Sequence, residues 1–371
     1  MNFAFTDEQE ELRKSIKRFL DDKSPISAVR DLMDTEEGFD KDVWAQMGTQ
    51  LGLQGIAIPE EYGGSGFSYV ELLVIFEELG RTLACVPFFS TVGLATGTLL
   101  SCDDDEAKKE YLSLIASGEK VATLAISEDS GRFDADGVTL KAEKSGEGYK
   151  LNGHKSFVVD GYTADLILVV GKSEAGISLF AVNSDAEGLI RQPLSTMDQT
   201  RKQARLEFNN VSAKVIGKDG GAWPTVEKGL QLAAVCLAAE QLGGAQVCLD
   251  MSVEYAKNRI QFGRPIGSFQ AIKHKCADML LQVESARSAA YYAAWAAQED
   301  SEELPVVSSL AKAFCSEAYF HCAGENIQIH GGIGFTWEHD AHLYFKRAKS
   351  SELMLGDPSY HRELMLQRLG I

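Results

Sequence analysis

The sequence has little that would mark a secreted, membrane-spanning or disulfide-bonded protein. Its seven Cys are odd in number and none has CxxC spacing, which argues against a disulfide scaffold or a zinc ribbon and favours buried, reduced thiols. No uninterrupted apolar run reaches the roughly 18 residues of a membrane span. The opening segment, Met1 to Glu8, lacks the basic and then apolar order of a signal peptide, so we expect a cytoplasmic protein without membrane contact.

Positive charge and several catalytic signatures are also scarce. The chain has 36 Lys and Arg against 54 Asp and Glu, a net charge of −18, so it lacks the basic field of a general nucleic-acid binder. It has no Walker-type loop, no GxSxG and no HExxH. We therefore interpret His339 and His342, with Glu338 and Asp340 beside them, as a solvated polar turn, and we expect no metal site.

Hydrophobic periodicity divides the 371 residues into three parts. Residues 1–120 show helical spacing and predict an N-terminal all-α domain, which opens with Thr6 as a helix N-cap. Residues 121–223 change to short strand-like runs and predict a small β-barrel or sandwich. Residues 224–371 return to long helical segments and predict a C-terminal four-helix bundle. The fold class expected is α+β in that order.

Some local patterns predict individual elements within these parts. Asn152-Gly153 stands between two strand-like runs and predicts a hairpin turn. Pro59 to Gly66 holds one Pro and three Gly and predicts an irregular loop. Long helices are expected over Leu230 to Arg259, over Phe269 to Gln298 and from Pro305 to about Gln328.

Two further segments combine small or cationic residues in ways that suit a phosphate or a flavin. Gly331 to Phe335 reads GGIGF after a predicted helix, so it lacks both the spacing and the preceding strand of a dinucleotide fingerprint. Its small residues would still allow a close backbone approach, although a simple turn explains them as well. Arg259 to Gly267 contains two guanidinium groups, which suit phosphate recognition or, alternatively, complement a helix dipole.

Taken together, these features resemble the acyl-CoA dehydrogenase family of flavoproteins over nearly the whole chain. The segments that carry the resemblance are Pro59-Glu60-Glu61-Tyr62-Gly63-Gly64, Leu151-Asn152-Gly153-His154-Lys155, Arg259-Ile260-Gln261-Phe262-Gly263-Arg264-Pro265-Ile266, Phe269-Gln270 and Gln328-Ile329-His330-Gly331-Gly332-Ile333-Gly334-Phe335. The resemblance implies FAD, an acyl-CoA substrate, an electron-transfer flavoprotein as electron acceptor, and a role in β-oxidation and lipid metabolism. It also implies a tetramer, and α,β-desaturation in which a carboxylate removes the α proton and the flavin takes a hydride.

The resemblance assigns a set of residues to FAD. Residues expected to hold its adenine and pyrophosphate across a subunit interface are Arg259, Phe262, Gln270, Gln328, Gly331 and Gly332. Residues expected to line the isoalloxazine ring are Leu124, Ile126, Ser127, Phe157 and Val159. Phe157 and Val159 stand where the family has Trp and a hydroxyl residue, and Asp129 to Asp134 depart from a Gly-Ser pair.

The catalytic base is the largest departure from the family pattern. The usual Glu before Gly falls on Leu355, which precedes Gly356, and the alternative position on the first bundle helix falls on Ala233 or Ala234. Two acids lie nearby in sequence. Asp357 is the first candidate base, although it could instead be a cap or turn residue before Pro358, or pair with His361 or Arg362. Glu240 is the second, although it could instead be a structural Glu with a buried partner.

Three functional hypotheses therefore stand beside one another. The chain is a self-sufficient acyl-CoA dehydrogenase with a displaced base, or a subunit that completes a partner's FAD site. In the second case it resembles the β-type subunits of the α2β2 steroid side-chain acyl-CoA dehydrogenases, and belongs to steroid catabolism. The third hypothesis is a structural interaction protein on the same fold, which the retained Arg259 and Gln328 segments disfavour.

Overall fold

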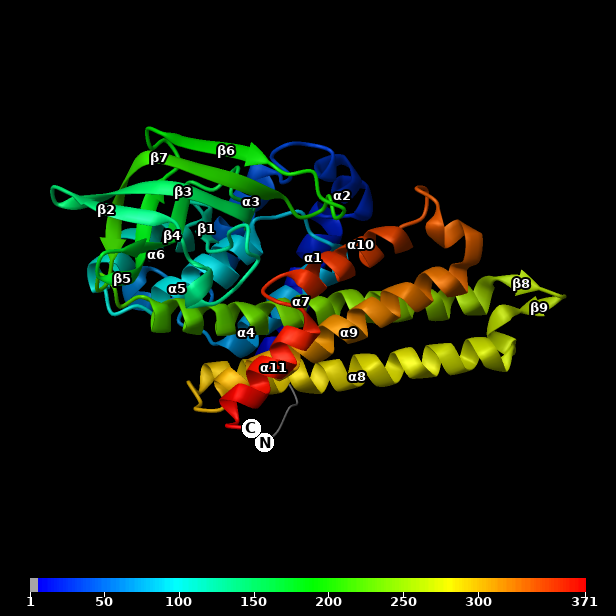
Figure 1. Cartoon of the computed structure of the whole chain (residues 1–371). Helices are drawn as coiled ribbons and strands as arrows, with labels where there is room; N and C mark the ends of the chain where they lie inside the picture. Colours follow the sequence, from blue (N-terminus) through cyan, green and yellow to red (C-terminus); the bar gives the residue numbers. More distant parts are fainter. Residues whose placement is uncertain (1–5) are drawn as a thin grey trace. The chain divides into compact units, whose positions relative to one another are not determined.

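The computed structural model describes residues 6–371, and its two compact units are described separately (Figure 1). The first unit comprises the chain up to Arg30, Tyr69–Ala84 and Ala234–Ile371, and the second comprises Asp31–Ser68 and Cys85–Ala233. Helix α7 (Trp223–Asn258) begins in the second unit and continues into the first.

The second unit is built around a sheet of seven strands, β1 to β7. Strands β4, β2, β3, β7 and β5 pair in that order, and β5 pairs back to β4, so these strands close into a small barrel (Figure 1). Strand β1 pairs with β4 in parallel, and β6 pairs with β7. The bounds are Ala122–Ala125, Lys141–Ser145, Gly148–Val159, Leu166–Ser173, Gly176–Asn183, Leu189–Pro193 and Gln203–Ile216. Strand β4 is buried along nearly its whole length.

The hairpin predicted at Asn152-Gly153 is wrong. Strand β3 continues through both residues, and the turn lies earlier, at Gly146, whose φ of +63° suits glycine. Between Leu151 and Asn152 the register with β7 shifts instead, which marks a β-bulge. Gly153 therefore lies beside a β-bulge inside one strand and not in a turn between two strands.

Short helices complete the second unit. They are α3 (Lys41–Thr49), η1 (Leu53–Gly55), η2 (Glu60–Tyr62), the π-helix η3 (Phe89–Thr96), α5 (Gly97–Leu100), α6 (Asp105–Ala116) and η4 (Ala135–Gly137). The loop predicted from Pro59 to Gly66 is confirmed apart from the single turn of η2. Gly64 is required there, since a Cβ atom on it would lie 2.0 Å from the Ile58 carbonyl oxygen.

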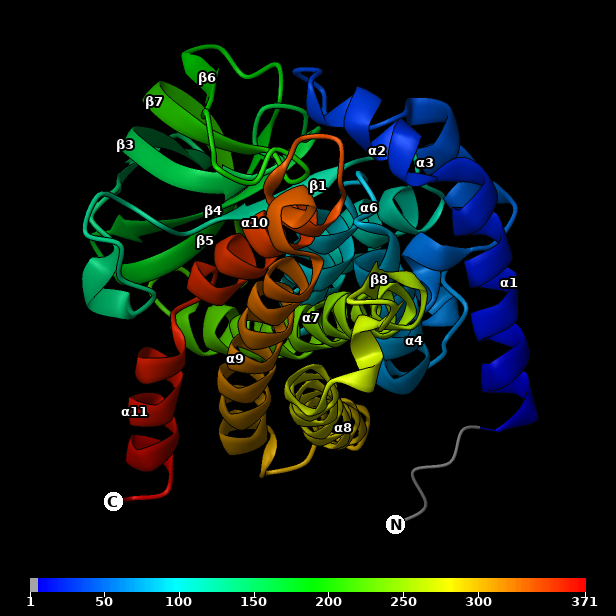
Figure 2. The same cartoon turned by 90° about the vertical axis from the view of Figure 1, so that its right-hand side faces the viewer.

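The first unit is a helical bundle. Helix α9 packs against α8, α10 and α11, and the long helices run side by side in both views (Figures 1 and 2). Its helices are α1 (Asp7–Lys23), α4 (Tyr69–Thr82), α8 (Gln270–Gln298), α9 (Leu304–His330), α10 (Ala341–Leu353) and α11 (Pro358–Arg368), with η5 (Ile266–Ser268), η6 (Gly331–Phe335) and the strands β8 (Ile260–Gln261) and β9 (Arg264–Pro265). Helix α2 (Ile26–Met33) lies where the chain leaves this unit.

Two glycines set the distance between α4 and α7. A Cβ atom on Gly80 would lie 2.0 Å from the carbonyl oxygen of Glu240, and one on Gly243 would lie 1.9 Å from that of Glu77. Each helix thus presents a glycine to the backbone of the other. Since a backbone atom cannot swing aside as a side chain can, this crossing depends on the absence of a side chain at both positions.

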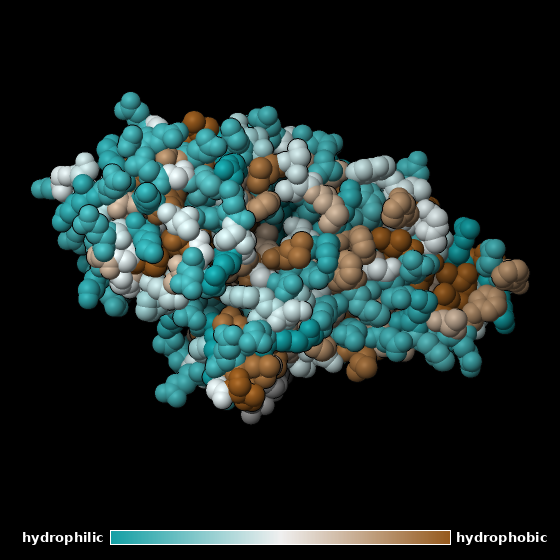
Figure 3. Space-filling model, in the orientation of Figure 1, coloured by the Kyte–Doolittle hydropathy of each residue, from teal (hydrophilic) through white to brown (hydrophobic). Residues whose placement is uncertain are grey.

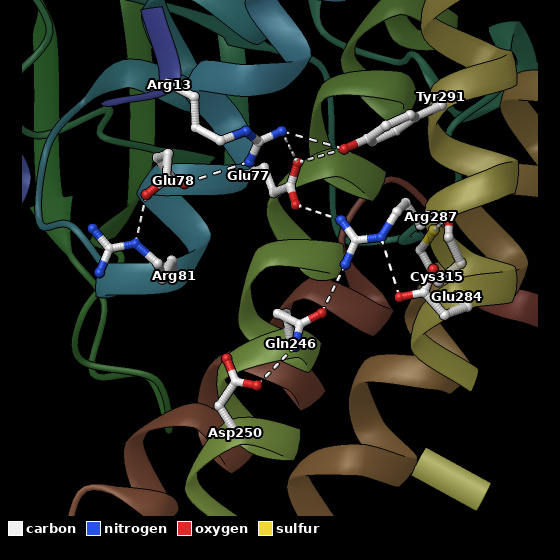
Figure 4. A network of polar contacts seen from close by, with 11 residues as sticks. Arg13, Glu77, Glu78, Arg81, Gln246, Asp250, Glu284, Arg287, Tyr291 and Cys315 are labelled. Carbon is white, nitrogen blue, oxygen red and sulfur yellow. Dashed lines mark hydrogen bonds and ion pairs between the residues drawn. The ribbon is translucent and has the colours of Figure 1, made fainter. Parts of the chain in front are cut away.

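A buried carboxylate ties four helices of the bundle together. Glu77 of α4 accepts hydrogen bonds from Arg13 of α1 at 2.9 Å and from Arg287 of α8 at 2.8 Å (Figure 4). The Tyr291 hydroxyl donates to the same carboxylate at 3.2 Å, and Arg287 also donates to Gln246 of α7. Glu77 is 5% exposed, so the two guanidinium groups balance a charge that water does not solvate.

The predicted fold class is confirmed, with helices on either side of a barrel in sequence; the predicted boundaries at residues 120 and 223 stay predictions. All seven Cys are free, and six of them are buried. Among residues 6–371, α7 is the one helix long and apolar enough to cross a membrane by length and composition. Some 89% of its apolar window is buried inside the protein, which is also the property of a soluble core helix.

Candidate functional site

The predicted cofactor residues of the first unit gather around a β-hairpin at one end of the bundle (Figure 1). Strands β8 and β9 are joined by Phe262 and Gly263, both with positive φ, +53° and +76°, as a type I′ turn requires. Phe262 is 88% exposed, and Arg259 just before the hairpin is also exposed. Brown and tan side chains gather over this end of the bundle in the space-filling view (Figure 3).

The remaining predicted residues of this unit are exposed as well. Gln270 opens α8, Gln328 lies in the last turn of α9, and Gly331 and Gly332 open η6 directly after that helix. A Cβ atom on either glycine would meet no atom within 4 Å. Within residues 6–371, the side chains of Arg259, Gln270 and Gln328 have no hydrogen-bond or ion-pair partner in the same chain.

The predicted flavin-lining residues of the second unit lie on neighbouring segments of the barrel. Leu124 belongs to β1, and Ile126 and Ser127 follow it; all three are buried. The Thr123 hydroxyl donates to the carbonyl oxygen of Val159 at 2.6 Å, and the Ser156 amide donates to that of Ser127 at 2.9 Å. These bonds join the end of β1 to the end of β3, so the fold brings this group of predicted residues together.

Phe157 stands out within the barrel strand β3. The register between β3 and β7 shifts between Lys155 and Val158, and Phe157 at this bulge has a φ of +56°. A bulky residue in the left-handed region is strained, and Phe157 is also 61% exposed, whereas Val159 is 5% exposed. The chain therefore maintains an exposed aromatic ring in an unfavourable backbone conformation, which is typical of a ligand-binding position.

A buried ion pair that the sequence reasoning missed supports this segment. Lys155 of β3 is fully buried and donates to the carboxylate of Glu128 at 2.7 Å and to the carbonyl oxygen of Ile126 at 2.9 Å. Burial lowers the pKa of Lys155 to about 8, despite the neighbouring carboxylate. Burial opposes ionisation of Glu128 too, but the Lys155 charge and hydrogen bonds from Thr139 and Leu140 outweigh it and lower the pKa of that carboxyl.

The segment that departs from the family pattern forms a polar cluster on the barrel. Asp129 accepts hydrogen bonds from Arg205 at 3.1 Å and from Ser156 at 3.2 Å, and its carboxylate lies 2.9 Å from Nε2 of His154. The neighbouring His154 ring, followed by Arg205, lowers the pKa of the Asp129 carboxyl. Contacts with barrel residues therefore fix the position of the altered loop. One of these residues, Ser156, directly precedes Phe157.

Asp357, the first candidate base, caps a helix. Its carboxylate accepts a hydrogen bond from the Tyr360 amide at 2.7 Å at the start of α11, and its side chain is exposed. The alternative interpretation of Asp357 as a cap is thus confirmed. The suggested partners bind elsewhere, since His361 contacts the carbonyl oxygen of Leu355 and Arg362 donates to Glu317.

Glu240, the second candidate base, lies in the bundle interior. It is 4% exposed and forms an ion pair with Arg347 of α10 at 2.9 Å. The alternative interpretation, a structural Glu with a buried partner, is thus confirmed. Ala233 and Ala234 are buried in α7, and Leu355 is buried between α10 and α11. None of these three residues offers a side chain that can take up a proton.

The solvated polar turn that we expected is confirmed for Glu338, His339 and Asp340, which lie in a turn and are exposed or half-buried, but it is wrong for His342. His342 is 7% exposed, and its ring lies 4.9 Å from that of Trp337, because α10 turns it into the bundle. The His339 ring instead accepts a hydrogen bond from the Ala341 amide. Among residues 6–371, no group of three or more His, Cys, Asp or Glu side chains could hold a metal ion.

Comparison with known proteins decides the family. Family models described as Acyl-CoA dehydrogenase N-terminal, middle and C-terminal domains match residues 6–119, 123–211 and 220–370. The chain belongs to the acyl-CoA dehydrogenase family. Its relatives include "Acyl-CoA dehydrogenase IpdE2" of Mycolicibacterium smegmatis, 35% identical over 95% of this chain and 96% of that protein.

Solved structures of the family share the fold over the whole chain. The "ChsE4-ChsE5 complex from Mycobacterium tuberculosis" matches with a TM-score of 0.90 at 29% identity, covering 100% of this chain and 99% of that one. A variant of the "Tcur3481-Tcur3483 steroid ACAD" matches with a TM-score of 0.89 at 28% identity, covering 98% of each chain. The predictions of an oxidoreductase of this family and of FAD as its cofactor are thereby confirmed.

The residues present fit FAD. The exposed guanidinium group of Arg259 and the exposed amides of Gln270 and Gln328 offer donors that the described part of the same chain leaves unpaired. Gly331 and Gly332 leave open space where a phosphate can approach the backbone. The role of each predicted residue remains a prediction.

Proposed function

We propose that the chain is one subunit of a hetero-oligomeric, FAD-dependent acyl-CoA dehydrogenase, and that another subunit supplies the carboxylate that removes the α proton. One observation carries this proposal: both candidate carboxylates have structural partners. Asp357 caps α11 in solvent, and Glu240 is paired with Arg347. A base for this reaction must be free to take up the α proton beside the substrate, whereas Asp357 is engaged as a cap in solvent and Glu240 is engaged with Arg347.

In this proposal the chain contributes residues that bind FAD. The chemistry that bound FAD would supply is a hydride acceptor for the β carbon of the thioester. Arg259, Gln270 and Gln328 would hold the cofactor with exposed donor groups, and Gly331 and Gly332 would leave room for it beside the backbone. The exposed Phe262 ring would pack against an apolar part of the cofactor. In the barrel, the exposed Phe157 ring offers a stacking surface, and the segment from Leu124 to Val159 supplies backbone donors and acceptors.

Two structural relatives support a mixed assembly. One is the ChsE4-ChsE5 complex, whose name gives two different chains. The other is the Tcur3481-Tcur3483 steroid ACAD, whose name also gives two chains. We therefore propose an α2β2 assembly in which this chain is the β-type subunit, a steroid-derived acyl-CoA as substrate, an electron-transfer flavoprotein as electron acceptor and a cytoplasmic location. The self-sufficient homotetramer and the structural interaction protein are the alternatives that the experiments below would reveal.

The first test is the FAD content of the chain purified alone and co-expressed with a related subunit. We expect little FAD and no acyl-CoA oxidation for the chain alone, and about one FAD per two chains with activity for the assembly. One FAD per chain with turnover by the chain alone would favour the self-sufficient enzyme. An absence of flavin in both preparations would favour the structural protein.

The second test concerns Asp357 in the active assembly. Asn caps helices about as well as Asp, so Asp357→Asn preserves the start of α11 while removing the carboxylate. We expect turnover within about twofold of the unchanged assembly. A loss of turnover at unchanged FAD content would identify Asp357 as the base and contradict the proposal.

A further inference from the structure

A lysine buried inside the bundle makes a complete set of contacts beneath the loop between α10 and α11. Lys312 of α9 is 0% exposed. Its ammonium group donates to the Ser316 hydroxyl at 2.9 Å and to the carbonyl oxygens of Glu352 and Gly356, both at 3.1 Å. An ammonium group has three protons, and each has an acceptor here. Such a fully paired arrangement compensates for the burial of a cation.

The loop that Lys312 contacts is strained. Leu355 has a φ of +61° and Gly356 a φ of +105°, so both lie in the region that favours glycine. A leucine there costs energy and persists only where surrounding contacts impose it. The Leu355 side chain is 6% exposed, and a Cβ atom on Gly356 would lie 2.2 Å from the Tyr360 ring. The loop is therefore tightly packed in this conformation.

A second buried side chain holds the same loop from α11. His361 is 5% exposed; its Nε2 lies 3.1 Å from the carbonyl oxygen of Leu355, and its Nδ1 lies 3.4 Å from the Ser309 hydroxyl. The neutral ring with the proton on Nε2 donates to Leu355 and accepts from Ser309. Lys312 and His361 together thus bind the carbonyl oxygens at the end of α10 and on both strained residues.

We propose that Lys312 is a positioning residue, which holds Leu355 to Asp357 in the conformation that the reaction of the assembled enzyme requires. This inference rests on the proposed function, because it assigns the loop to the acyl-CoA site of the assembly. The strain at Leu355, together with the two buried side chains that impose it, is the reason to expect a function, since strained residues cluster at functional sites.

The contacts of Lys312 persist in either protonation state. Burial lowers its pKa to about 7, opposed by the carboxylate of Glu352 and the thiol of Cys315, and more weakly by Asp357. A neutral amine retains two N–H donors for the carbonyl oxygens of Glu352 and Gly356. Its lone pair can accept from the Ser316 hydroxyl, which also contacts the Gln241 amide. Loop position therefore depends on the presence of the amine rather than on its charge.

The first experiment measures amide hydrogen exchange in the assembled, FAD-loaded protein carrying Lys312→Met. Methionine fills similar volume but cannot donate, so two carbonyl oxygens lose their partner. We expect the amides of Met354 and Gly356, which are bonded to Ser350 and Leu353, to exchange about tenfold faster or more. Lys349→Met is the matched control: it removes a partly exposed lysine that pairs with the Glu352 carboxylate and should leave both amides unchanged. Unchanged exchange in Lys312→Met would overturn the proposal.

The second experiment measures turnover of the same two variants. We expect Lys312→Met to lower kcat about tenfold with KM and FAD content nearly unchanged, whereas Lys349→Met retains full activity. Faster exchange with normal kcat would show that the loop has no part in the reaction and would also overturn the proposal. If Lys312→Met does not fold, His361→Gln loosens the same loop from α11 and gives the same comparison. The FAD content of the unaltered assembly is measured alongside. If the proposed function is wrong, the number of FAD molecules per chain in the unaltered protein will differ from the expected value, whereas a failure of the present inference leaves that number unchanged.

Discussion

The buried pair of Glu240 and Arg347 gives the sharpest test of how the bundle interior is used. Their side chains are 5% and 3% exposed, and the atoms lie 2.9 Å apart. Glu240→Ala removes the carboxylate and leaves the Arg347 guanidinium group buried without it. Breaking a buried pair from one side typically costs about 3–5 kcal/mol of unfolding free energy. Glu240→Gln keeps an oxygen near Arg347, so we expect a smaller loss of about 1–2 kcal/mol.

Urea unfolding of the FAD-loaded protein measures these losses at fixed protein and FAD concentration. Glu317→Ala is the matched control, because Glu317 also pairs with an arginine, Arg362, but both side chains are about half exposed. We expect less than about 1 kcal/mol there. A double variant, Glu240→Leu with Arg347→Met, should be more stable than Glu240→Ala, since it removes both buried charges rather than one.

Two results would refute this reasoning. If Glu240→Ala costs no more than Glu317→Ala, then burial of the pair does not determine its contribution. If Glu240→Gln unfolds like the unchanged protein but its assembly has lost turnover at normal FAD content, then Glu240 is the base rather than a structural residue.

Three further predictions concern packing, cofactor and pH. Gly243→Ala should cost more than about 1–3 kcal/mol, because the new methyl group meets a backbone oxygen at 1.9 Å, whereas Gly324→Ala, with its nearest neighbour at 3.9 Å, should be neutral or stabilising in urea unfolding. Phe262→Ala should lower the FAD content of the assembly with little change in unfolding free energy, while Leu310→Ala, also at an exposed apolar residue, should leave the FAD content unchanged. Burial lowers the pKa of His361 to about 3 in the folded chain, compared with about 6.5 in the unfolded chain. Between these two pH values the unfolded chain binds a proton at His361 and the folded chain does not. Stability should fall as pH falls through this window, and His361→Gln should flatten that slope; an unchanged slope would contradict the assignment.

Local patterns predicted individual elements well where short-range chemistry decides them. Thr6 caps α1 and exchanges hydrogen bonds with Gln9, as its position before an acidic first turn indicated. The helices expected over Leu230 to Arg259 and over Phe269 to Gln298 correspond to α7, which begins seven residues earlier, and to α8, which begins one residue later. Asn152-Gly153 failed because the same dipeptide suits a bulge within a strand, and only pairing with β7 distinguishes the two.

The candidate site was predictable in part. Phe262 and Gln328 lie in contiguous segments that are typical of the family. These segments were sufficient to assign both residues to the cofactor site from the sequence alone. The partners of buried charges could not be read in this way. Glu128 and Lys155 are 27 residues apart, and Glu77 and Arg287 are 210 apart, so neither pair leaves a local signal.

The sequence by itself determined the family, the order of helices and strands, and the absence of a usable carboxylate at the two usual positions, because these follow from residue identity and short spacing. Only the tertiary structure decided what the remaining acids do. Asp357 is a cap because α11 begins beside it, and Glu240 is paired because α10 brings Arg347 to α7. Lys312 reaches a strained loop 40 or more residues away because α9 passes beneath it. The burial of these side chains and the identity of their partners follow from packing between helices that are distant in sequence, and local sequence patterns do not specify that packing.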